Sequence, residues 1–222
     1  MYWLQGPSFY GDLRQPAPLP DFSHVRSLQD LSRRDCERLA EQQGFAGHLT
    51  FDGRHFEWTR RIDFQPQAPL ADAGSLRWQR GVLIEEGRDL PYVEHWHRDP
   101  SIAAQPAAAA LLLGRRGALS LLIRSGGYYI LARDRPVKPA PRASLAECVA
   151  AAPTLEDARA LVDCEISFAR ASSGKIPILA STLPHRVGCN LGDGLDSGWE
   201  ILKSEGDADA LGHCLDGGRR SG

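Results

Sequence analysis

One arginine of the sequence stands among residues that a strand would turn toward a hydrophobic core. In HFEWTRRIDF, residues 55–64, alternation puts Arg60 on the face that also carries Trp58 and Ile62, because successive side chains of a strand point to opposite sides. A buried guanidinium is normally ion-paired, hydrated or used to hold a ligand. Its planar fork suits the paired oxygens of a carboxylate or an enolate, so Arg60 is a candidate oxyanion-binding group.

A glutamate has the same setting in PYVEHWHR, residues 91–98. Alternation places Glu94 on the face of Tyr92 and Trp96. If both aromatic faces point into one hollow, Arg60 and Glu94 enter it together. Glu94 would serve there as an acid or base beside the Tyr92 hydroxyl, while Arg60 stabilises an oxyanion. Arg60, Glu94 and Tyr92 are therefore the candidate catalytic residues.

Three structural alternatives stay open for these charges. Arg60 could lie at the rim of a sheet, with its stem on Trp58 and its head in water. A β-bulge could change the phase of alternation and turn either charge outward. Arg60 and Glu94 could also form a buried ion pair that has no chemical role.

An aromatic-lined hollow of this kind would hold a small molecule. We expect an aromatic or amphipathic ligand, oriented by Arg60. STLPHR, residues 181–186, would end a strand near the mouth of a barrel and adds a histidine. The candidate ligand-binding residues are Trp58, Phe64, Trp78, Trp96 and His185.

Other chemistry has less support. His95 and His97 share one strand face and could chelate a metal with His55, but that face lies away from the aromatic residues, so the sequence favours solvent-exposed histidines and no metal site. Tyr10, Asp12 and Arg14 alternate on one face of a short strand, which is typical of surface ion pairing. The sequence has no nucleophile elbow, zinc-protease, phosphate-loop or dinucleotide fingerprint, so we expect no cofactor.

Composition indicates an ordinary globular protein. The 222 residues are 42% hydrophobic and 24% charged, with a formal net charge of −2, and no basic stripe suggests a nucleic-acid partner. Five scattered cysteines and no visible signal peptide predict a reduced, cytoplasmic protein. The longest apolar run, residues 107–113, is too short to cross a bilayer, so we expect no membrane partner. The sequence leaves a homodimer open.

Local signals predict strands with few helices. Ser32 followed by Asp35 is a capping box, and Gly44 suits a left-handed stop, so a helix is predicted over residues 33–43. From residue 47 the hydrophobic period becomes two, and Asp52-Gly53 is a strong hairpin signal. The second half repeats the plan around a Gly126-Gly127 turn, with a helical or loop segment over residues 143–161.

These elements predict a mainly β fold of two small antiparallel barrels with one or two short helices. The bland segment over residues 99–110 is the candidate boundary. The predicted division is an N-terminal barrel over residues 1–106, a C-terminal barrel over residues 107–204 and a loose tail over residues 205–222.

Several short motifs resemble those of a bacterial family of uncharacterised proteins with a calycin-type, lipocalin-like double barrel. The motifs are WLQ at residues 3–5, DLR at 12–14, GFAG at 44–47, WTRRIDFQP at 58–66 and STLP at 181–184. The resemblance covers roughly residues 2–188 and is similar in organisation to a fungal two-barrel protein that interacts with a casein-kinase homologue. It implies the fold and a small-molecule pocket. The lipocalin GxW signature is not cleanly present and the haem-binding GxWxGxG pattern is absent, so neither pigment nor haem is expected.

Three functions follow as hypotheses. The first is a small-molecule-binding barrel. The second is a cofactor-independent lyase or isomerase acting on a small aromatic or carboxylate-bearing substrate through Arg60 and Glu94. The third is a protein-interaction module, as the fungal resemblance suggests. Fold alone does not choose between them.

Overall fold

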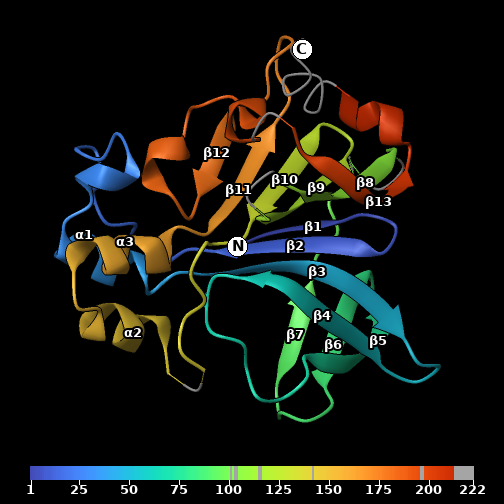
Figure 1. Ribbon diagram of the computed structural model, residues 1–222. Helices are drawn as coiled ribbons and strands as arrows, with labels where there is room; N and C mark the ends of the chain where they lie inside the picture. The colour runs from blue at the N-terminus through green and yellow to red at the C-terminus, as the bar shows by residue number, and fades with distance from the viewer. Residues whose placement is uncertain (101, 103–104, 115–116, 142, 196–197, 213–222) are drawn as a thin grey trace.

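Two antiparallel sheets form the body of the protein, with short helices gathered at one side (Figure 1). The computed structural model describes residues 1–100, 102, 105–114, 117–141, 143–195 and 198–212. The prediction of a mainly β, barrel-like fold is confirmed. Three α-helices occur in the described residues, where one or two were expected.

The first sheet is a meander in which each strand pairs with its neighbours along the chain. The hairpin predicted at Asp52-Gly53 joins its third and fourth strands. The Asp52 carboxylate accepts hydrogen bonds from the N–H groups of Arg54 and His55 at 2.8 and 2.7 Å, and Gly53 takes a φ of 98° that favours glycine. The strands are β1 Tyr2–Gln5, β2 Phe9–Arg14, β3 Gln43–Phe51, β4 Phe56–Asp63, β5 Ala73–Gln79, β6 Val82–Gly87 and β7 Val93–Trp96.

The second sheet is built from the rest of the chain. Its strand order is β12-β11-β10-β9-β8-β13, so the last strand returns to pair with β8 at one edge. The strands are β8 Ala107–Leu113, β9 Leu119–Ser125, β10 Tyr128–Arg133, β11 Glu165–Arg170, β12 Ile178–Ser181 and β13 Glu200–Gly206.

The first helix begins where the capping box predicts. In α1, Arg33–Leu39, the Ser32 hydroxyl accepts from the Asp35 N–H, and the Asp35 carboxylate accepts from the Ser32 N–H. The prediction that the helix continues to a stop at Gly44 is wrong, because the chain has already entered β3. A Cβ at residue 44 would lie 2.9 Å from Ile166 Cδ1, so this glycine serves close packing.

The predicted helical segment of the second half forms two helices, each with its own capping box. They are α2 Leu145–Ala151 and α3 Leu155–Val162, and they lie beside α1 at the same side of the sheets (Figure 1). Short 3-10 turns complete the described structure: η1 Leu28–Asp30, η2 Pro184–Arg186, η3 Leu191–Gly194 and η4 Ala208–Leu211.

One hydrophobic core lies between the two sheets. Leu4 and Leu13 of the first sheet are buried there with Leu121 and Ile130 of the second. Gly11 allows the close approach, because a Cβ at this position would lie 2.7 Å from Ile130 Cγ2. The two halves of the chain therefore share a core, and burial of this apolar surface drives their association.

Arg135 also joins the halves through the backbone. This side chain is 4% exposed, and its Nη2 donates to the carbonyl oxygen of Asp63 at 3.0 Å. Nη2 also donates to the carbonyl oxygen of Phe64, and Nη1 donates to that of Leu161. Hydrogen bonds to these carbonyl oxygens offset much of the free-energy cost of taking the guanidinium out of water.

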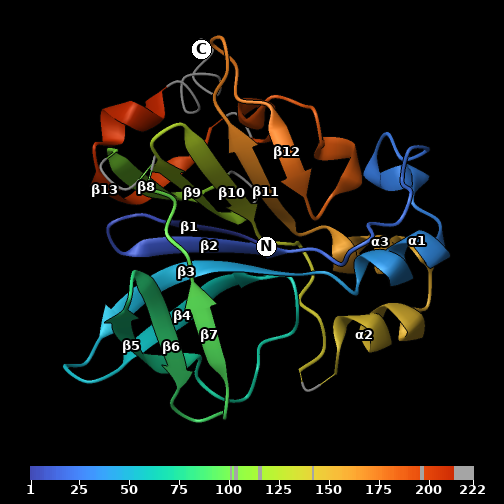
Figure 2. The same ribbon diagram turned by 180° about the vertical axis from the view of Figure 1, so that it is seen from behind.

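Away from the shared core, each sheet has a second, separate interior. The first sheet curls until its edge strands meet, with the ring centroids of Trp3 on β1 and Trp96 on β7 5.0 Å apart (Figure 2). Among the described residues no hydrogen-bonded ladder pairs β1 with β7, so the barrel is half closed. We call this concave side the N-terminal half-barrel. The corresponding C-terminal interior is an apolar cluster that includes Ala108, Ala110, Leu112, Leu122, Leu131, Leu191 and Leu211.

The first sheet ends at Trp96 and the second begins at Ala107, on either side of the predicted boundary, and the division into two domains stays a prediction. The predicted start of the loose tail, residue 205, is too early, because the chain is still in β13 there. Glu205 lies in β13 and accepts hydrogen bonds from the N–H groups of Ser8 and Phe9, both at 2.7 Å, while residues 213–222 lie outside the described structure. None of the described helices has the length and apolar character needed to cross a membrane.

Candidate functional site

A β-bulge in β4 decides which residues face the N-terminal half-barrel. The ladder between β3 and β4 pairs residues on both sides of Arg61 but skips Arg61 itself. A bulge shifts the phase of alternation. Arg60 therefore shares the concave face with Trp58, as predicted, whereas Ile62 turns into the core between the sheets and Asp63 takes its place beside Arg60.

The bulge depends on a glycine in the facing strand. Gly47 pairs with Arg60, and a Cβ on Gly47 would lie 1.9 Å from the carbonyl oxygen of Thr59. Any other residue would push β3 and β4 apart at this point. The local sequence thus fixes the direction of Arg60 through its partner strand.

Two aspartates and one aromatic ring surround Arg60. Its Nη1 lies 3.1 Å from Asp63 Oδ2 and its Nη2 lies 2.6 Å from Asp72 Oδ2. The guanidinium carbon is 3.7 Å from the centroid of the Phe45 ring, a cation–π contact. Arg60 is therefore already engaged by this chain's own carboxylates.

A second set of hydrogen bonds centres on Glu85, which is 4% exposed. The Tyr92 hydroxyl donates to its Oε1 at 2.7 Å and the Trp96 indole N–H donates to its Oε2 at 2.9 Å. Burial raises the pKa of Glu85 above its ordinary value. Burial and the hydrogen bond to Glu85 also raise the pKa of Tyr92, so this phenol stays protonated and acts as a donor.

Glu94 does face inward, but it pairs with a different arginine. Arg14 Nη1 lies 3.4 Å from Glu94 Oε1, and Arg14 Nε lies 2.6 Å from Asp12 Oδ2. The alternative of an ion pair between Arg60 and Glu94 is therefore wrong. The Asp12–Arg14 pair is real, yet Asp12 is fully buried, so the expectation of surface pairing there is wrong as well.

Aromatic rings form the wall of this interior. Trp3 stacks on Tyr10 with centroids 4.9 Å apart and planes 7° apart, and it touches Trp96 at 5.0 Å. Tyr10 meets the edge of Phe45 at 6.1 Å, and Trp58 packs in the same cluster. These faces present negative π-electron density to the polar groups beside them.

Three buried polar atoms of the half-barrel have no hydrogen-bond partner in the described structure. They are the Tyr10 hydroxyl oxygen, Asp12 Oδ1 and Arg60 Nε, and both Tyr10 and Asp12 are 0% exposed. A buried polar atom without a partner costs about 1–3 kcal/mol, and native proteins contain few such atoms. These three lie in one interior, and four more such atoms lie elsewhere in the described structure, on Arg135, His185, Arg186 and Trp199.

The charges of this interior do not balance. Among the described residues, five carboxyl groups lie in it with two guanidinium groups, those of Arg14 and Arg60. Burial raises the pKa of Asp12, Asp63 and Glu85 above their ordinary values, because few cations offset their desolvation. The carboxyl groups belong to Asp12, Asp63, Asp72, Glu85 and Glu94.

Two of the five predicted ligand-binding residues belong to the half-barrel, and three lie elsewhere. Trp58 and Trp96 belong to the half-barrel, but Phe64 is fully buried in the core between the sheets because the bulge reverses its direction. Trp78 sits near the tip of the β5–β6 hairpin and is 59% exposed. His185 lies in the 3-10 turn η2, which follows β12.

No group of three metal-binding side chains occurs within the part of the chain that the structure describes. His95 and His97 are both exposed.

The C-terminal interior has a polar cluster of its own, and there the charges balance. Glu165 Oε1 accepts from Arg186 Nε at 2.9 Å and from the Ser167 hydroxyl at 2.7 Å. Arg133 lies 3.9 Å from the other oxygen of Glu165 and 2.6 Å from Asp163. Each charge has an opposite neighbour.

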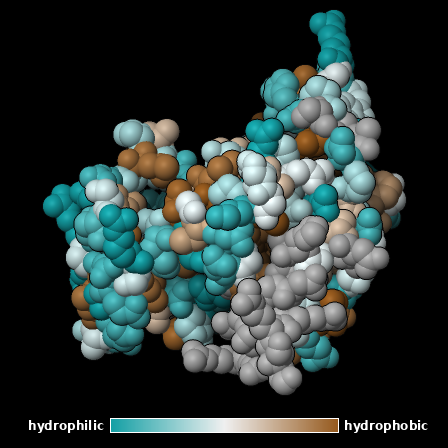
Figure 3. Space-filling view, turned by 90° about the horizontal axis from the view of Figure 1, so that it is seen from above, coloured by the Kyte–Doolittle hydropathy of each residue, from teal (hydrophilic) through white to brown (hydrophobic). Residues whose placement is uncertain are grey.

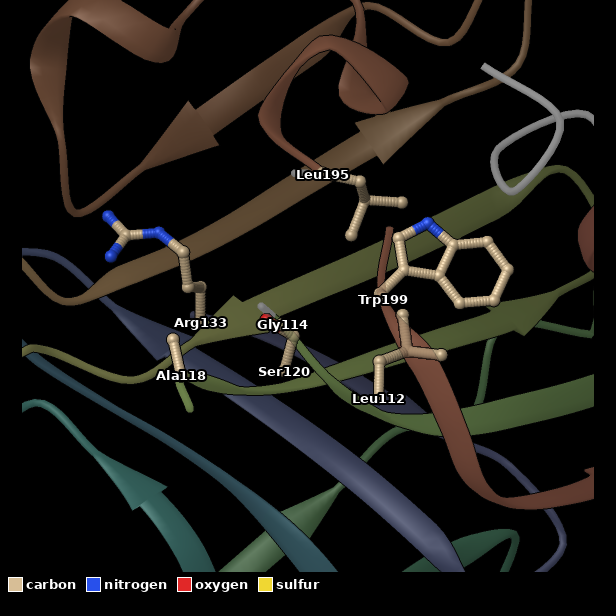
Figure 4. Close-up of a pocket in the computed structure, with 7 residues that line it drawn as sticks. All are labelled: Leu112, Gly114, Ala118, Ser120, Arg133, Leu195 and Trp199. Carbon is tan, nitrogen blue, oxygen red and sulfur yellow. The ribbon is translucent and has the colours of Figure 1, made fainter. Parts of the chain in front are cut away.

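A small cavity of about 10 Å³ lies near this cluster (Figure 4). That is room for about one water molecule. Figure 4 shows Leu195 and Trp199 over the cavity and Arg133 pointing away from them. The lining residues are Leu112, Gly114, Ala118, Ser120, Arg133, Leu195 and Trp199.

Several residues of the half-barrel were not identified from the sequence. Asp72 follows a proline-containing loop, where no alternation of polar and apolar residues exists, so the sequence does not predict the direction of its side chain. Glu85 follows Ile84 in GVLIEE, and its inward direction becomes clear only from its pairing opposite Glu94. Phe45 stands in the GFAG motif that carried the family resemblance.

Comparison with known proteins identifies no relative. No family model matches the chain, and no curated protein or solved structure matches it. The resemblance to a lipocalin-like double-barrel family therefore stays a prediction.

Proposed function

We propose that the N-terminal half-barrel binds a small organic molecule that carries a positive charge. The observation that supports this most strongly is the pair of fully buried atoms without partners, the Tyr10 hydroxyl oxygen and Asp12 Oδ1, within an acid-rich aromatic interior. An aromatic or amphipathic amine fits such a place.

The chemistry of each group suits an ammonium. Asp12 Oδ1 would accept a charge-assisted hydrogen bond, and the Tyr10 oxygen would accept a second. The faces of Trp3 and Tyr10 would attract the same charge through cation–π contact. Arg60 would act as a positioning residue that holds Asp63 and Asp72, and would not itself meet the ligand's charge.

The cluster reaches solvent at its rim. The side chains of Arg60 and Asp72 are 25% and 27% exposed, and those of Arg14 and Glu94 are 31% and 32% exposed. A ligand would enter past these four residues. The carboxylates among them would attract a cation electrostatically before it meets the interior.

Calorimetric titration with 2-phenylethylamine tests the proposal, with 3-phenylpropionate as the anion of similar shape. We expect the amine to bind with a shift of the indole resonances of Trp3 and Trp96, and the carboxylate to leave those resonances unchanged. Asp12→Asn should weaken amine binding about tenfold, the usual effect of losing one charge-assisted hydrogen bond. Asp193→Asn is the matched control, because Asp193 is exposed on η3. A shift of these indole resonances by the carboxylate and not by the amine would refute the proposal.

A proton-transfer reaction is the second candidate, and the raised pKa of Glu85 beside Tyr92 favours it. The basic role would then belong to Glu85, which touches Tyr92, and not to Glu94. Glu85→Gln should abolish turnover of a substrate while leaving amine binding measurable. A protein-interaction role stays a third hypothesis.

A cytoplasmic location is part of the proposal. It is supported by the free state of the four described cysteines, Cys36, Cys148, Cys164 and Cys189. Small-molecule binding does not depend on it.

A further inference from the structure

A groove outside both interiors has the opposite character to the half-barrel. It lies between the segment over residues 15–26, helix α1 and the chain from β12 into η2, and its volume is about 640 Å³. Small-molecule sites usually measure about 300–1,000 Å³. Figure 3 shows apolar surface along the hollow between the helical lobe, at the left, and the β body.

The floor of this groove is held firmly. Gln15 Nε2 donates to Gln42 Oε1 at 2.8 Å and to the Ser181 carbonyl at 3.0 Å. Gln42 Nε2 donates to the Thr182 carbonyl at 3.1 Å. These bonds tie the N-terminal segment to β12, so the groove is formed before a ligand arrives.

The walls combine exposed apolar side chains with positive charge. Leu19, Leu179 and Val187 line the groove while being 55%, 50% and 49% exposed. Clustered exposed apolar side chains commonly mark a binding surface.

Two arginines, Arg26 and Arg38, line the same groove. No hydrogen bond or ion pair of either guanidinium occurs within the described ranges. No Asp or Glu is among the lining residues, so nothing within the lining balances the two charges.

A third polar group faces the same space. His185 lines the groove, and its Nδ1 is buried without a hydrogen-bond partner. Burial lowers the pKa of His185, so at neutral pH it is an uncharged hydrogen-bonding group, and Arg26 and Arg38 supply the charge.

We infer that this groove binds an amphipathic carboxylate, with its apolar body against Leu19, Leu179 and Val187 and its carboxylate held by Arg26 and Arg38. This site is separate from the half-barrel and prefers the opposite charge. The inference therefore does not depend on the proposed amine binding.

Titration with decanoate and with decanol, both below their aggregation concentrations, tests the inference. We expect decanoate to bind more tightly than decanol. Arg38→Ala should weaken decanoate binding about tenfold and leave decanol binding unchanged. Arg34→Ala is the matched control, because Arg34 is exposed on α1 and does not line the groove. Leu179→Asp should weaken both ligands, and Leu90→Asp, at an equally exposed leucine far along the chain, should weaken neither.

A measurement on the wild-type protein tests the inference even if the variants fail to fold. In methyl-labelled protein, decanoate should shift the resonances of Leu19, Leu179 and Val187 and leave the indole resonances of Trp3 and Trp96 unchanged. Equal affinity for decanoate and decanol, an equal loss in Arg34→Ala and Arg38→Ala, or shifts confined to the tryptophans would each overturn the inference.

Discussion

The two interiors of this protein use the same residue types in opposite ways. In the C-terminal interior, Glu165 meets Arg186 and a serine, and Arg133 meets Asp163, so its charges are paired. In the N-terminal half-barrel, carboxyl groups outnumber guanidinium groups and polar atoms of Tyr10, Asp12 and Arg60 are left without partners. Polar atoms without partners occur in both, because Arg186 Nη2 and Trp199 Nε1 of the C-terminal interior also lack them. The difference between the two interiors is therefore the excess of carboxyl groups in the half-barrel.

Apolar packing follows the same division. The cluster in the C-terminal interior is filled mainly by alanine, leucine and isoleucine around the single ring of Tyr129, and the cavity near its polar groups has room for about one water molecule. The half-barrel is lined by large aromatic rings that contact one another at their faces and edges. Such rings offer a guest flat surfaces that a packed aliphatic core does not offer.

Removing one carboxylate from each interior should give the largest difference. Glu165→Ala should lower the free energy of unfolding by about 3–5 kcal/mol, because it leaves Arg186, whose side chain is only 12% exposed, without its ion pair. Asp72→Ala should cost about 1 kcal/mol or less, because Asp72 is partly exposed and Arg60 keeps Asp63. Urea denaturation measures both values. An equal or larger loss in Asp72→Ala would break the comparison.

The next prediction concerns how the stability of the half-barrel depends on pH. Asp12, Asp63 and Glu85 have raised pKa values in the folded protein, so the folded state retains these protons to a higher pH than the unfolded state. Their contribution to stability is therefore greatest at low pH and is lost as the pH rises through the folded pKa values. Amine binding should change in the opposite direction, because it needs the ionised carboxylates.

Denaturation and amine titration from pH 5 to pH 7 check this together. The wild-type protein should lose stability relative to the double variant Asp12→Asn/Glu85→Gln as the pH rises, while its affinity for 2-phenylethylamine increases. The variant should show a smaller change in both quantities. If stability and amine affinity instead rose or fell together with pH, the ionisation of these carboxyl groups would not be the cause of both changes.

Local rules predicted the elements well and the site only in part. The capping box at Ser32 and the Asp52-Gly53 hairpin are where short-range chemistry puts them. Arg60 was expected on the concave face with Trp58 and is there. Its neighbours were not predictable from alternation, because one unpaired residue, Arg61, exchanges the faces of everything after it.

The partners of Arg60 and Glu94 required the fold itself. Asp72 comes from a loop, and Arg14 is far away in sequence on β2, so their positions depend on how the sheet curls. The charge excess became visible only when the residues of four separate strands and a loop were assembled. A single strand pattern carries no information about that balance.

The smallest expected effect concerns a tryptophan that was predicted to bind the ligand. Trp78 is 59% exposed near the tip of the β5–β6 hairpin, whereas Trp96 donates to Glu85 inside the half-barrel. Trp78→Ala should change the free energy of unfolding by about 0.5 kcal/mol or less and leave affinity for 2-phenylethylamine unchanged, as denaturation and calorimetry would measure. Trp96→Phe should weaken amine binding, because the Glu85 carboxylate loses one of its two donors and its position becomes less fixed. If Trp78→Ala weakened binding as much as Trp96→Phe, the ligand would have to reach beyond the half-barrel onto the hairpin tip.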